Sequence, residues 1–434
     1  MSDSAKRVVI TGLGIVSPIG IGIERFEAGL KAGQSGIAPI SLIPYNAAPG
    51  GIGAEVKELT DETAKTTWLK GQRKSFKVYS RDIQLGVLAA IIGIEHAGLK
   101  VEALAHERIG VEFGSNQMYS PPDVLQGGAD ACADENLNFQ FDRWGQTGLP
   151  AMEPLWLLKY LPNMPSCHIS ILADARGPSN SLTMNEASGN ASIGEAIRIM
   201  RRGQADIMIT GATGTRTASI KGIHAALQDE LANHPGEPPE TWSRPFDATR
   251  NGQVLGEGAG ALMLETEAFA AARGATIYGS ILGTGSSCVI NKQGRPNFRL
   301  AFANATRAAF RDARVTADDI GHVNAFGLGA FRCDAEEAAA IHDLFGNRAE
   351  EIPVTAFKSQ LGNSGAGSGP LELAASLLGL RAGVVYPTLN YRTPDPACRL
   401  NIVTGKPLPI SNKLLLKLST TDMGQATALI AAGV

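Results

Sequence analysis

Short apolar runs rich in β-branched residues alternate along the chain with longer stretches in which apolar residues recur every three or four positions. The first pattern predicts strands and the second predicts helices. In the first part of the chain we expect strands at 7–16, 108–116, 167–173 and 205–213, and helices at 81–98 and 192–203. Because these strands are apolar throughout and are separated by helices, they predict a sheet that helices cover on both faces.

The same alternation restarts in the second part of the chain. Strands are expected at 258–265, 275–287, 322–327 and 414–420, and helices near 299–314, 334–345 and 370–381. Two successive halves with one element order predict an internally duplicated α/β fold, with the first half at residues 1–257 and the second at 258–434.

The segment 118–165 interrupts the first half. It is irregular and rich in Pro, Gly, Asp and Trp. A connection of this length is uncommon in a compact domain unless it has a function of its own. We therefore predict an insertion that forms a partner surface or a lid over the site.

Composition and charge narrow the class of protein. The 434 residues are 44% hydrophobic and 19% charged, which suits a large buried core and argues against disorder. A net charge of −3 offers no basic surface for nucleic acid or for an anionic membrane. No apolar run reaches the roughly 18 residues that span a bilayer, and the N-terminus lacks the apolar segment of a secretory signal. We expect a cytoplasmic protein with no membrane span and no nucleic-acid partner.

Several familiar sites are not supported by the residues. The five cysteines are scattered without a Cys-x-x-Cys pair, which is typical of reduced thiols. Cys167 and His168 are neighbours in a predicted strand, so their side chains point to opposite faces and do not form a catalytic pair. Glycines 12, 14 and 20 do not make the GxGxxG pattern of a dinucleotide site. We find no metal-ligand spacing and predict neither a metal nor a cofactor.

The stretch SLTMNEASGNASIGEA at 181–196 predicts a tight turn between an extended run and a helix. Such an elbow often presents a nucleophile at a helix N-terminus. Here the apex carries Glu186 in place of a thiol or hydroxyl, and Ser188 is expected to form a hydrogen bond at the helix start. A glycine-rich turn at 364–372 could hold a phosphate, although tight packing of the loop is the favoured interpretation.

Six segments carry a resemblance to a known family, and they come in that family's order. They are YLPNMPSCHISI (160–171), GPSNSLTMNEASGNASIGEA (177–196), SRPFDATRNGQVLGEGAGALMLE (243–265), VNAFGLGAFRCDAEEAAAI (323–341), FKSQLGNSGAGSGPLE (357–372) and YPTLNYRTPDPACRLNIV (386–403). Together with the opening strand they resemble the beta-ketoacyl-acyl carrier protein synthases of fatty acid and polyketide assembly, over essentially the whole chain. The resemblance implies the duplicated thiolase fold, with five alternating layers (αβαβα), and a dimer. It also implies an acyl carrier protein as partner, with an acyl chain on its phosphopantetheine arm.

Family members condense acyl groups with a cysteine at the elbow and two histidines that stabilise an enolate. When the flanking motifs are aligned, Glu186 stands at the cysteine, Phe326 at the first histidine and Asn363 at the second. Lys358 matches the family lysine, and Glu337 matches one of two family acids. The other acid is Asp334, and of the family's C-terminal glycine-rich segment little beyond Gly424 remains at 418–427. The resemblance therefore implies a member that has lost condensation chemistry.

Three interpretations of Glu186 stay open. It is a structural carboxylate at the positive end of a helix, a counterpart of the polar amide that replaces cysteine in chain length factors, or an acid/base group. Phe326 is expected to fill the volume of the lost imidazole. Asn363 is expected to donate a hydrogen bond without carrying charge, and Lys358 and Glu337 are expected to form a buried ion pair.

The favoured hypothesis is a non-condensing partner that forms a heterodimer with an active ketosynthase, as a chain length factor does. One alternative is an enzyme that uses Glu186 to decarboxylate or hydrolyse acyl- or malonyl-carrier protein. Another is a homodimer that binds an acyl chain or its carrier protein without chemistry.

Overall fold

A large mixed sheet organises the chain. The computed structural model describes residues 7–43 and 46–434, and within them this sheet has 12 strands. Its first-half strands are β1 (Val8–Ser17), β2 (Gly20–Ile21), β5 (Ile109–Ser115), β6 (Ser179–Asn180), β7 (Ile207–Thr215) and β8 (Glu257–Thr266). Its second-half strands are β9 (Gly279–Cys288), β10 (His322–Asn324), β11 (Pro353–Thr355), β13 (Asn401–Ile402), β15 (Leu414–Thr420) and β16 (Gln425–Gly433).

The two halves repeat one pattern of strand pairing. The order is β6-β5-β7-β8-β1 in the first half and β11-β10-β15-β16-β9 in the second, where β13 adds a further strand beyond β11. In each half the first three strands are parallel, and the last two join antiparallel. The halves meet where β1 pairs with β9, at Val9 with Ser280 and at Ile10 with Gly279. The predicted duplicated fold is thus confirmed.

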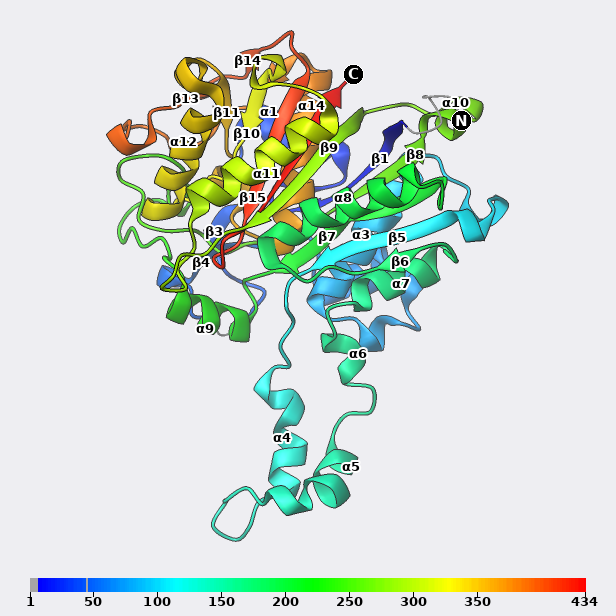
Figure 1. The fold of residues 1–434 in the computed structure, drawn as a ribbon. Coiled ribbons are helices and arrows are strands. Elements are labelled where there is room, and N and C mark those ends of the chain that lie inside the picture. Colours follow the sequence, from blue (N-terminus) through cyan, green and yellow to red (C-terminus); the bar gives the residue numbers. More distant parts are fainter. Residues whose placement is uncertain (1–6, 44–45) are drawn as a thin grey trace.

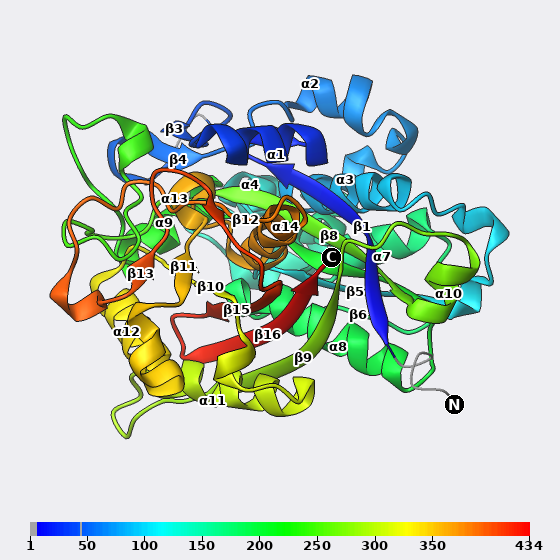
Figure 2. The same ribbon diagram turned by 90° about the horizontal axis from the view of Figure 1, so that it is seen from above.

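Helices form three layers around the two halves of the sheet (Figures 1 and 2). Helix α3 (Arg81–His96) covers β1, β7 and β8 on one outer face, and α11 (Phe298–Ala313) covers β9 and β16 on the other. Between them lie α8 (Ser188–Arg201) and α14 (Ser368–Arg381), which contact strands of both halves. This is the five-layered thiolase-like arrangement.

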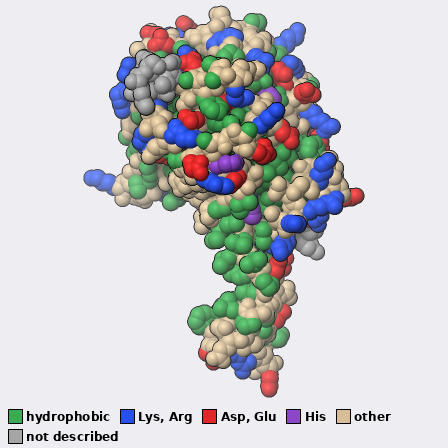
Figure 3. Space-filling model, turned by 90° about the vertical axis from the view of Figure 1, so that its right-hand side faces the viewer, with side chains coloured by type: hydrophobic (Ala, Val, Ile, Leu, Met, Phe, Trp, Pro, Cys, Tyr) green, Lys and Arg blue, Asp and Glu red, His purple; other side chains and the backbone are tan. Residues whose placement is uncertain are grey.

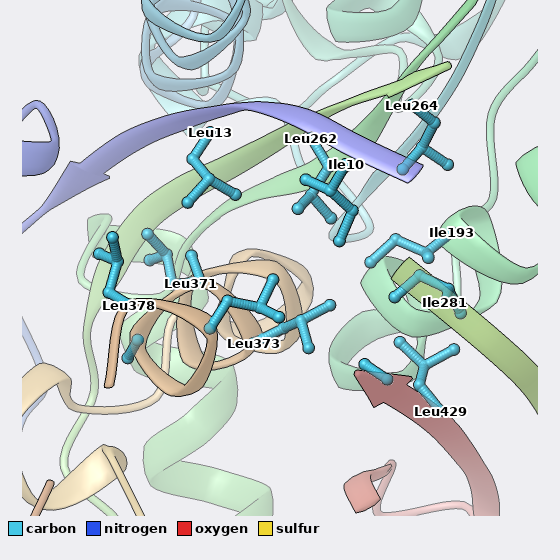
Figure 4. Close-up of a cluster of buried hydrophobic side chains, with 14 of the residues drawn as sticks. Ile10, Leu13, Ile193, Leu262, Leu264, Ile281, Leu371, Leu373, Leu378 and Leu429 are labelled. Atoms are coloured by element: carbon cyan, nitrogen blue, oxygen red, sulfur yellow. The ribbon is translucent and has the colours of Figure 1, made fainter. Parts of the chain in front are cut away.

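The core lies around the two central helices. Figure 4 shows leucines and isoleucines of α8 and α14 packed against strands of both halves, including Ile193, Leu373, Ile10 and Leu429. Residues Ser368–Leu380 of α14 are all buried, as expected for a helix enclosed on every side. Burial of this apolar surface brings the N-termini of α8 and α14 close together.

The remaining helices are shorter or lie at the periphery. They are α1 (Ile23–Ala32), α2 (Asp61–Thr63), α4 (Pro122–Ala131), α5 (Leu149–Ala151), α6 (Leu157–Tyr160), α7 (Met164–Leu172), α9 (Ser219–Gln228), α10 (Glu267–Ala272), α12 (Phe331–Phe345) and α13 (Lys358–Leu361). Two small sheets pair β3 (Ile37–Pro39) with β4 (Ile52–Ala54) and β12 (Val384–Val385) with β14 (Leu408–Pro409). No helix in residues 7–43 or 46–434 combines the length and apolar character needed to cross a bilayer.

One predicted strand is wrong. Residues 167–172 fall in helix α7, which ends before Ala173, and the strand of this region is the two-residue β6. Pro165 stands in the first turn, where its fixed φ favours a helix, and His168 and Ile169 are buried on the side that packs on α3. The β-branched composition suggested a strand, but burial of a helical stripe decided the conformation. The strand alternation that separated Cys167 from His168 in the sequence argument does not apply in this helix, and His168 contacts the Tyr79 ring.

The segment 118–165, here called the arm, projects away from the body (Figures 1 and 3). It contains α4, α5 and α6. Its exposed large apolar side chains are Leu137, Phe139, Phe141, Leu149, Leu155, Leu157 and Leu161. The arm's function and the half boundary at residue 257 stay predictions.

Candidate functional site

The elbow before α8 places a carboxylate at the centre of the site. Asn185, Glu186 and Ala187 form one 3-10 turn, in which Asn185 has a φ of 44°. This left-handed conformation is uncommon outside glycine, and Asn tolerates it better than most residues. The Ser188 hydroxyl accepts from the Met184 amide at 2.7 Å, so it is used at the helix start as predicted. Glu186 is buried at the apex.

An arginine and an amide bind the Glu186 carboxylate. Its Oε1 accepts from a guanidinium nitrogen of Arg216 and from Nδ2 of Asn363, the latter at 3.0 Å. The other terminal nitrogen of Arg216 donates to Asp229, just after α9. The carboxylate is therefore held by an ion pair, and the helix terminus is not its sole support.

Arg216 is absent from the residues singled out in the sequence. It directly follows β7, whose parallel neighbour β5 lies beside the elbow. A charged residue at the carboxyl end of a parallel strand is the signal that could have identified it, because ligands and charged groups gather at that edge.

Asn363 uses its whole amide within the protein. Its Nδ2 donates to Glu186 and Gln253, while its Oδ1 accepts from the Gly365 amide at 3.0 Å and from the Ser368 hydroxyl at 3.3 Å. An amide offers two donors and one acceptor oxygen, and here every one is engaged. The Asn363 amide therefore has a fixed orientation.

The glycine-rich turn after Asn363 is packed tightly. The Ala366 amide donates to Oδ1 of Asn116 at 2.7 Å, and Gly365–Gly367 are buried. The Gly365 and Ala366 N–H groups thus have protein partners, which agrees with the favoured interpretation of residues 364–372 over a phosphate site.

Phe326 stands beside Glu186 at the same cavity. Its ring is buried, and Nζ of Lys358 lies 4.0 Å from the ring centroid, which is a cation–π contact. The same Nζ donates to the Phe326 carbonyl at 3.0 Å. The backbone amides of Phe326 and Gly327 donate to the two carboxylate oxygens of Glu337, at 2.6 and 2.9 Å.

The predicted ion pair between Lys358 and Glu337 is wrong. Lys358 instead donates to Glu372 of α14 at 2.7 Å, and Lys417 of β15 binds the other oxygen of Glu372. Glu337 lies behind the loop that carries Phe326, where backbone amides occupy its oxygens. Helix α14 brings Glu372 between the two lysines, and sequence spacing did not reveal this contact.

Burial shifts the pKa values of three side chains near Lys358. It raises the pKa of Glu337 to about 7 against the lowering effect of the two amides. It likewise raises the pKa of Asp334 to about 6 and lowers the pKa of Lys417 to about 8. None of these three groups lines the cavity.

A cavity of about 300 Å³ opens in front of Glu186 and Phe326. One part of its wall is apolar, with Pro296, Phe298, Leu328, Ala330 and Cys333. The rest is polar and includes Asn116, Gln117, Tyr119, Asn185, Arg216, Lys221, His224, Gln228, Asp229, Glu230, Gln253, Arg332, Thr420, Thr421 and Asp422. Of the predicted site residues, Glu186 and Phe326 thus face the cavity, whereas Asn363, Lys358 and Glu337 support them from behind.

No His, Cys, Asp or Glu cluster suited to a metal ion occurs in the part of the chain that the structure describes. The cavity instead combines hydrogen-bonding groups with an apolar wall, an arrangement that suits a small organic ligand.

Comparisons with known proteins agree on one family. The family models for the beta-ketoacyl synthase N-terminal and C-terminal domains match residues 5–270 and 278–392. The chain is 32% identical to 3-oxoacyl-[acyl-carrier-protein] synthase 2 of Coxiella burnetii, covering 92% of each chain. It is 34% identical to the tetracenomycin polyketide synthase ketoacyl synthase alpha subunit of Streptomyces glaucescens, covering 92% of this chain and 90% of that one.

Solved structures show the same fold. The ishigamide ketosynthase/chain length factor superposes with a TM-score of 0.82 at 28% identity, and a beta-ketoacyl synthase from Burkholderia phymatum with 0.84 at 27%. Each comparison covers 99% of both chains. The matches, together with the paired halves and the elbow before α8, show that the chain belongs to the beta-ketoacyl synthase family.

Proposed function

We propose that this chain is the non-condensing partner of an active ketosynthase in fatty acid or polyketide assembly, in the manner of a chain length factor. In this role it binds a cysteine-bearing synthase and helps to shape the space in which a carrier-bound acyl chain grows. The observation that carries the proposal is the Glu186 carboxylate, which Arg216 and Asn363 bind at the elbow.

The ion pair argues against a covalent role for Glu186. A nucleophile at the elbow must attack a thioester and form an acyl-enzyme. The Glu186 carboxylate would have to leave Arg216 to do so, and breaking a buried pair costs about 3–5 kcal/mol. The product would be a mixed anhydride, which water hydrolyses readily.

The surroundings of Phe326 argue against stabilisation of an enolate. That step needs a hydrogen-bond donor directed at the developing negative charge. Phe326 supplies an apolar ring, and Nζ of Lys358 beneath it is engaged by Glu372 and by the Phe326 carbonyl. The Asn363 donors are likewise engaged.

The exposed arm supports a partner-binding role. Leu137 and Phe141 are 86% and 80% exposed near its far end, and large apolar side chains that gather on a surface mark interaction sites. Among related structures, the ishigamide ketosynthase/chain length factor combines the two kinds of component named in the proposal.

Co-expression with a ketosynthase that carries the cysteine and both histidines tests the proposal. A tag on one chain should retain a stable one-to-one heterodimer, and the pair should extend a carrier-bound acyl chain. A chain that stays homodimeric beside several such synthases would overturn the proposal.

A matched pair of variants separates this role from catalysis by Glu186. Glu186→Gln should leave both the heterodimer and its product intact, whereas changing the partner's nucleophilic cysteine to alanine should abolish the product. Turnover of malonyl- or acyl-carrier protein by the isolated chain, lost in Glu186→Gln, would support the enzymatic alternative instead.

A further inference from the structure

Around Arg216 the cavity lining holds more negative than positive charge. Glu186, Asp229 and Asp422 line it together with Arg216. Arg216 is the hub of the group, because it binds Glu186 and Asp229 directly and its charge also acts on Asp422. Two carboxylates thus bind this guanidinium and a third lies near enough to be affected by its charge, and we call these four residues the acidic floor.

The other cations along the cavity are already neutralised. Lys221 binds both oxygens of Asp82 at 3.0 Å. Arg332 on the rim donates to Glu336 at 2.7 Å. Glu230 adds a further carboxylate to the lining. Among the described residues that line the cavity, each Lys and Arg therefore has an acidic partner, and the acidic floor has no second cation.

Aromatic rings also line the cavity. The His224 ring contacts the Tyr119 ring edge-on, with 4.5 Å between centroids, and the Phe326 ring fills the apolar side of the floor. A negative group that enters the cavity thus meets more carboxylates than cations, and the cations are already engaged in ion pairs.

We propose that the acidic floor makes this cavity select uncharged acyl groups and reject acyl groups that end in a carboxylate, with Asp229 and Asp422 as the specificity-determining residues. The proposal rests on the proposed function only in taking an acyl group on a pantetheine arm as the ligand. A malonyl group would bring its carboxylate toward a floor that already has two uncompensated negative charges. Coulomb repulsion between the malonyl carboxylate and these charges, in a partly solvated cavity, is expected to weaken binding about tenfold.

The pKa values of Asp229 and Asp422 predict how this selectivity depends on pH. Burial and the charge of Glu186 raise the pKa of Asp229 to about 6, although Arg216 opposes the shift. The pKa of Asp422 is raised by the same two causes. Lowering the pH from 7.5 to 5.5 should therefore neutralise part of the floor while the malonyl carboxylate stays ionised. The other titratable or charged groups at this cavity are Glu186, Arg216, Glu230, His224, Lys221, Arg332, Tyr119 and Cys333.

The experiment compares amide-linked acetyl- and malonyl-pantetheine, which cannot hydrolyse, by calorimetric titration of the purified chain. The wild-type protein should bind the malonyl derivative about tenfold more weakly at pH 7.5, and this ratio should shrink at pH 5.5. Asp229→Asn/Asp422→Asn should bind both derivatives alike at both pH values. Asp206→Asn, which alters an ion pair outside the cavity, is the matched control and should keep the wild-type ratio.

Equal or tighter binding of the malonyl derivative by the wild-type protein would overturn the inference, as would failure to bind either derivative. If the double variant does not fold, Asp422→Asn alone and the wild-type pH series still decide the matter, because Asp422 lies in an exposed turn. These readouts use the isolated chain. Failure to form a heterodimer would therefore count against the proposed function and leave this binding ratio unaffected.

Discussion

Buried charges at the site form two groups that share no residue. Glu186, Arg216 and Asp229 line the cavity, whereas Glu372 lies between Lys358 and Lys417 behind Phe326. A buried charge without a partner is costly, so each group keeps its charges in contact. The first group binds the elbow to α9, and the second links α13, α14 and β15.

Arg216→Ala should destabilise the protein by about 3–5 kcal/mol, because it leaves Glu186 and Asp229 without their shared cation. Urea unfolding at pH 7.5 measures the loss. Arg108→Ala removes the partly exposed pair with Asp206 and serves as the control, with an expected cost below about 1 kcal/mol. Equal losses in the two variants would contradict the assignment.

Glu112 should make stability depend on pH. It is fully buried in β5, and burial and the charge of Glu195 raise its pKa from 4.5 to about 7. The unfolded chain therefore releases this proton at lower pH than the folded one, so stability should fall as pH rises from about 4.5 to about 7. The linkage amounts to up to about 3 kcal/mol.

Glu112→Gln stays uncharged and should lack this loss. Urea unfolding at pH 5, 6, 7 and 8 should show that the free energy of unfolding of the variant, relative to that of the wild type, increases as pH rises. Glu58→Gln, at an exposed pair with Arg25, should follow the wild type. Parallel profiles for Glu112→Gln and the wild type would refute the argument.

At the scale of elements, the site depends on two helices that are preceded by the same type of turn. A 3-10 turn precedes α8 at Asn185–Ala187 and α14 at Gly365–Gly367. The two helix starts pack closely, and a Cβ at Gly189 would lie 2.4 Å from Cδ of Pro370 and 2.8 Å from the Ala366 carbonyl oxygen. Glycine at this position therefore allows the elbow to approach the turn that follows Asn363.

Gly189→Ala should destabilise the protein by about 1–3 kcal/mol, because the added methyl must displace backbone and a proline ring. Gly194→Ala on the same helix is the matched control. Its Cβ would meet Thr284 at ordinary contact distances of 3.4–3.5 Å, so helix propensity should make it neutral or stabilising by up to about 1 kcal/mol. Thermal unfolding of the two variants distinguishes them, and a stable Gly189→Ala protein would contradict the close packing.

At the scale of the molecule, the site belongs to neither half alone. Glu186 and Arg216 come from the first half, while Phe326, Asn363 and Asp422 come from the second. The halves meet through β1 and β9 and through the two central helices. The arm leaves this body beside the cavity, since Gln117 and Tyr119 near its base line the wall.

Leu137→Asp/Phe141→Asp should leave the stability of the isolated chain unchanged within about 0.5 kcal/mol, because both side chains are exposed. If the arm contacts the partner synthase, the double variant should no longer co-purify with that synthase. Leu227→Asp, at an exposed position on α9, should retain it. Retention of the heterodimer by the double variant would exclude the tip of the arm from the interface.

Sequence reasoning was strongest where burial imposes a local period. The 3.6-residue pattern predicted α3, α11 and α14, because one or more of their faces must be apolar to pack on the sheet. It failed for α7, where a short β-branched run also fits a strand. The motifs identified Glu186 and Phe326 because each stands in a distinctive stretch of sequence.

The amino-acid sequence by itself determined most of the order of elements, the family and the carboxylate at the elbow, because local periodicity and contiguous motifs encode these. Only the tertiary structure decided that Arg216 binds Glu186 and that Lys358 pairs with Glu372. The partner of a charged side chain depends on which strands and helices lie side by side, and a single polar residue has no period that would reveal it.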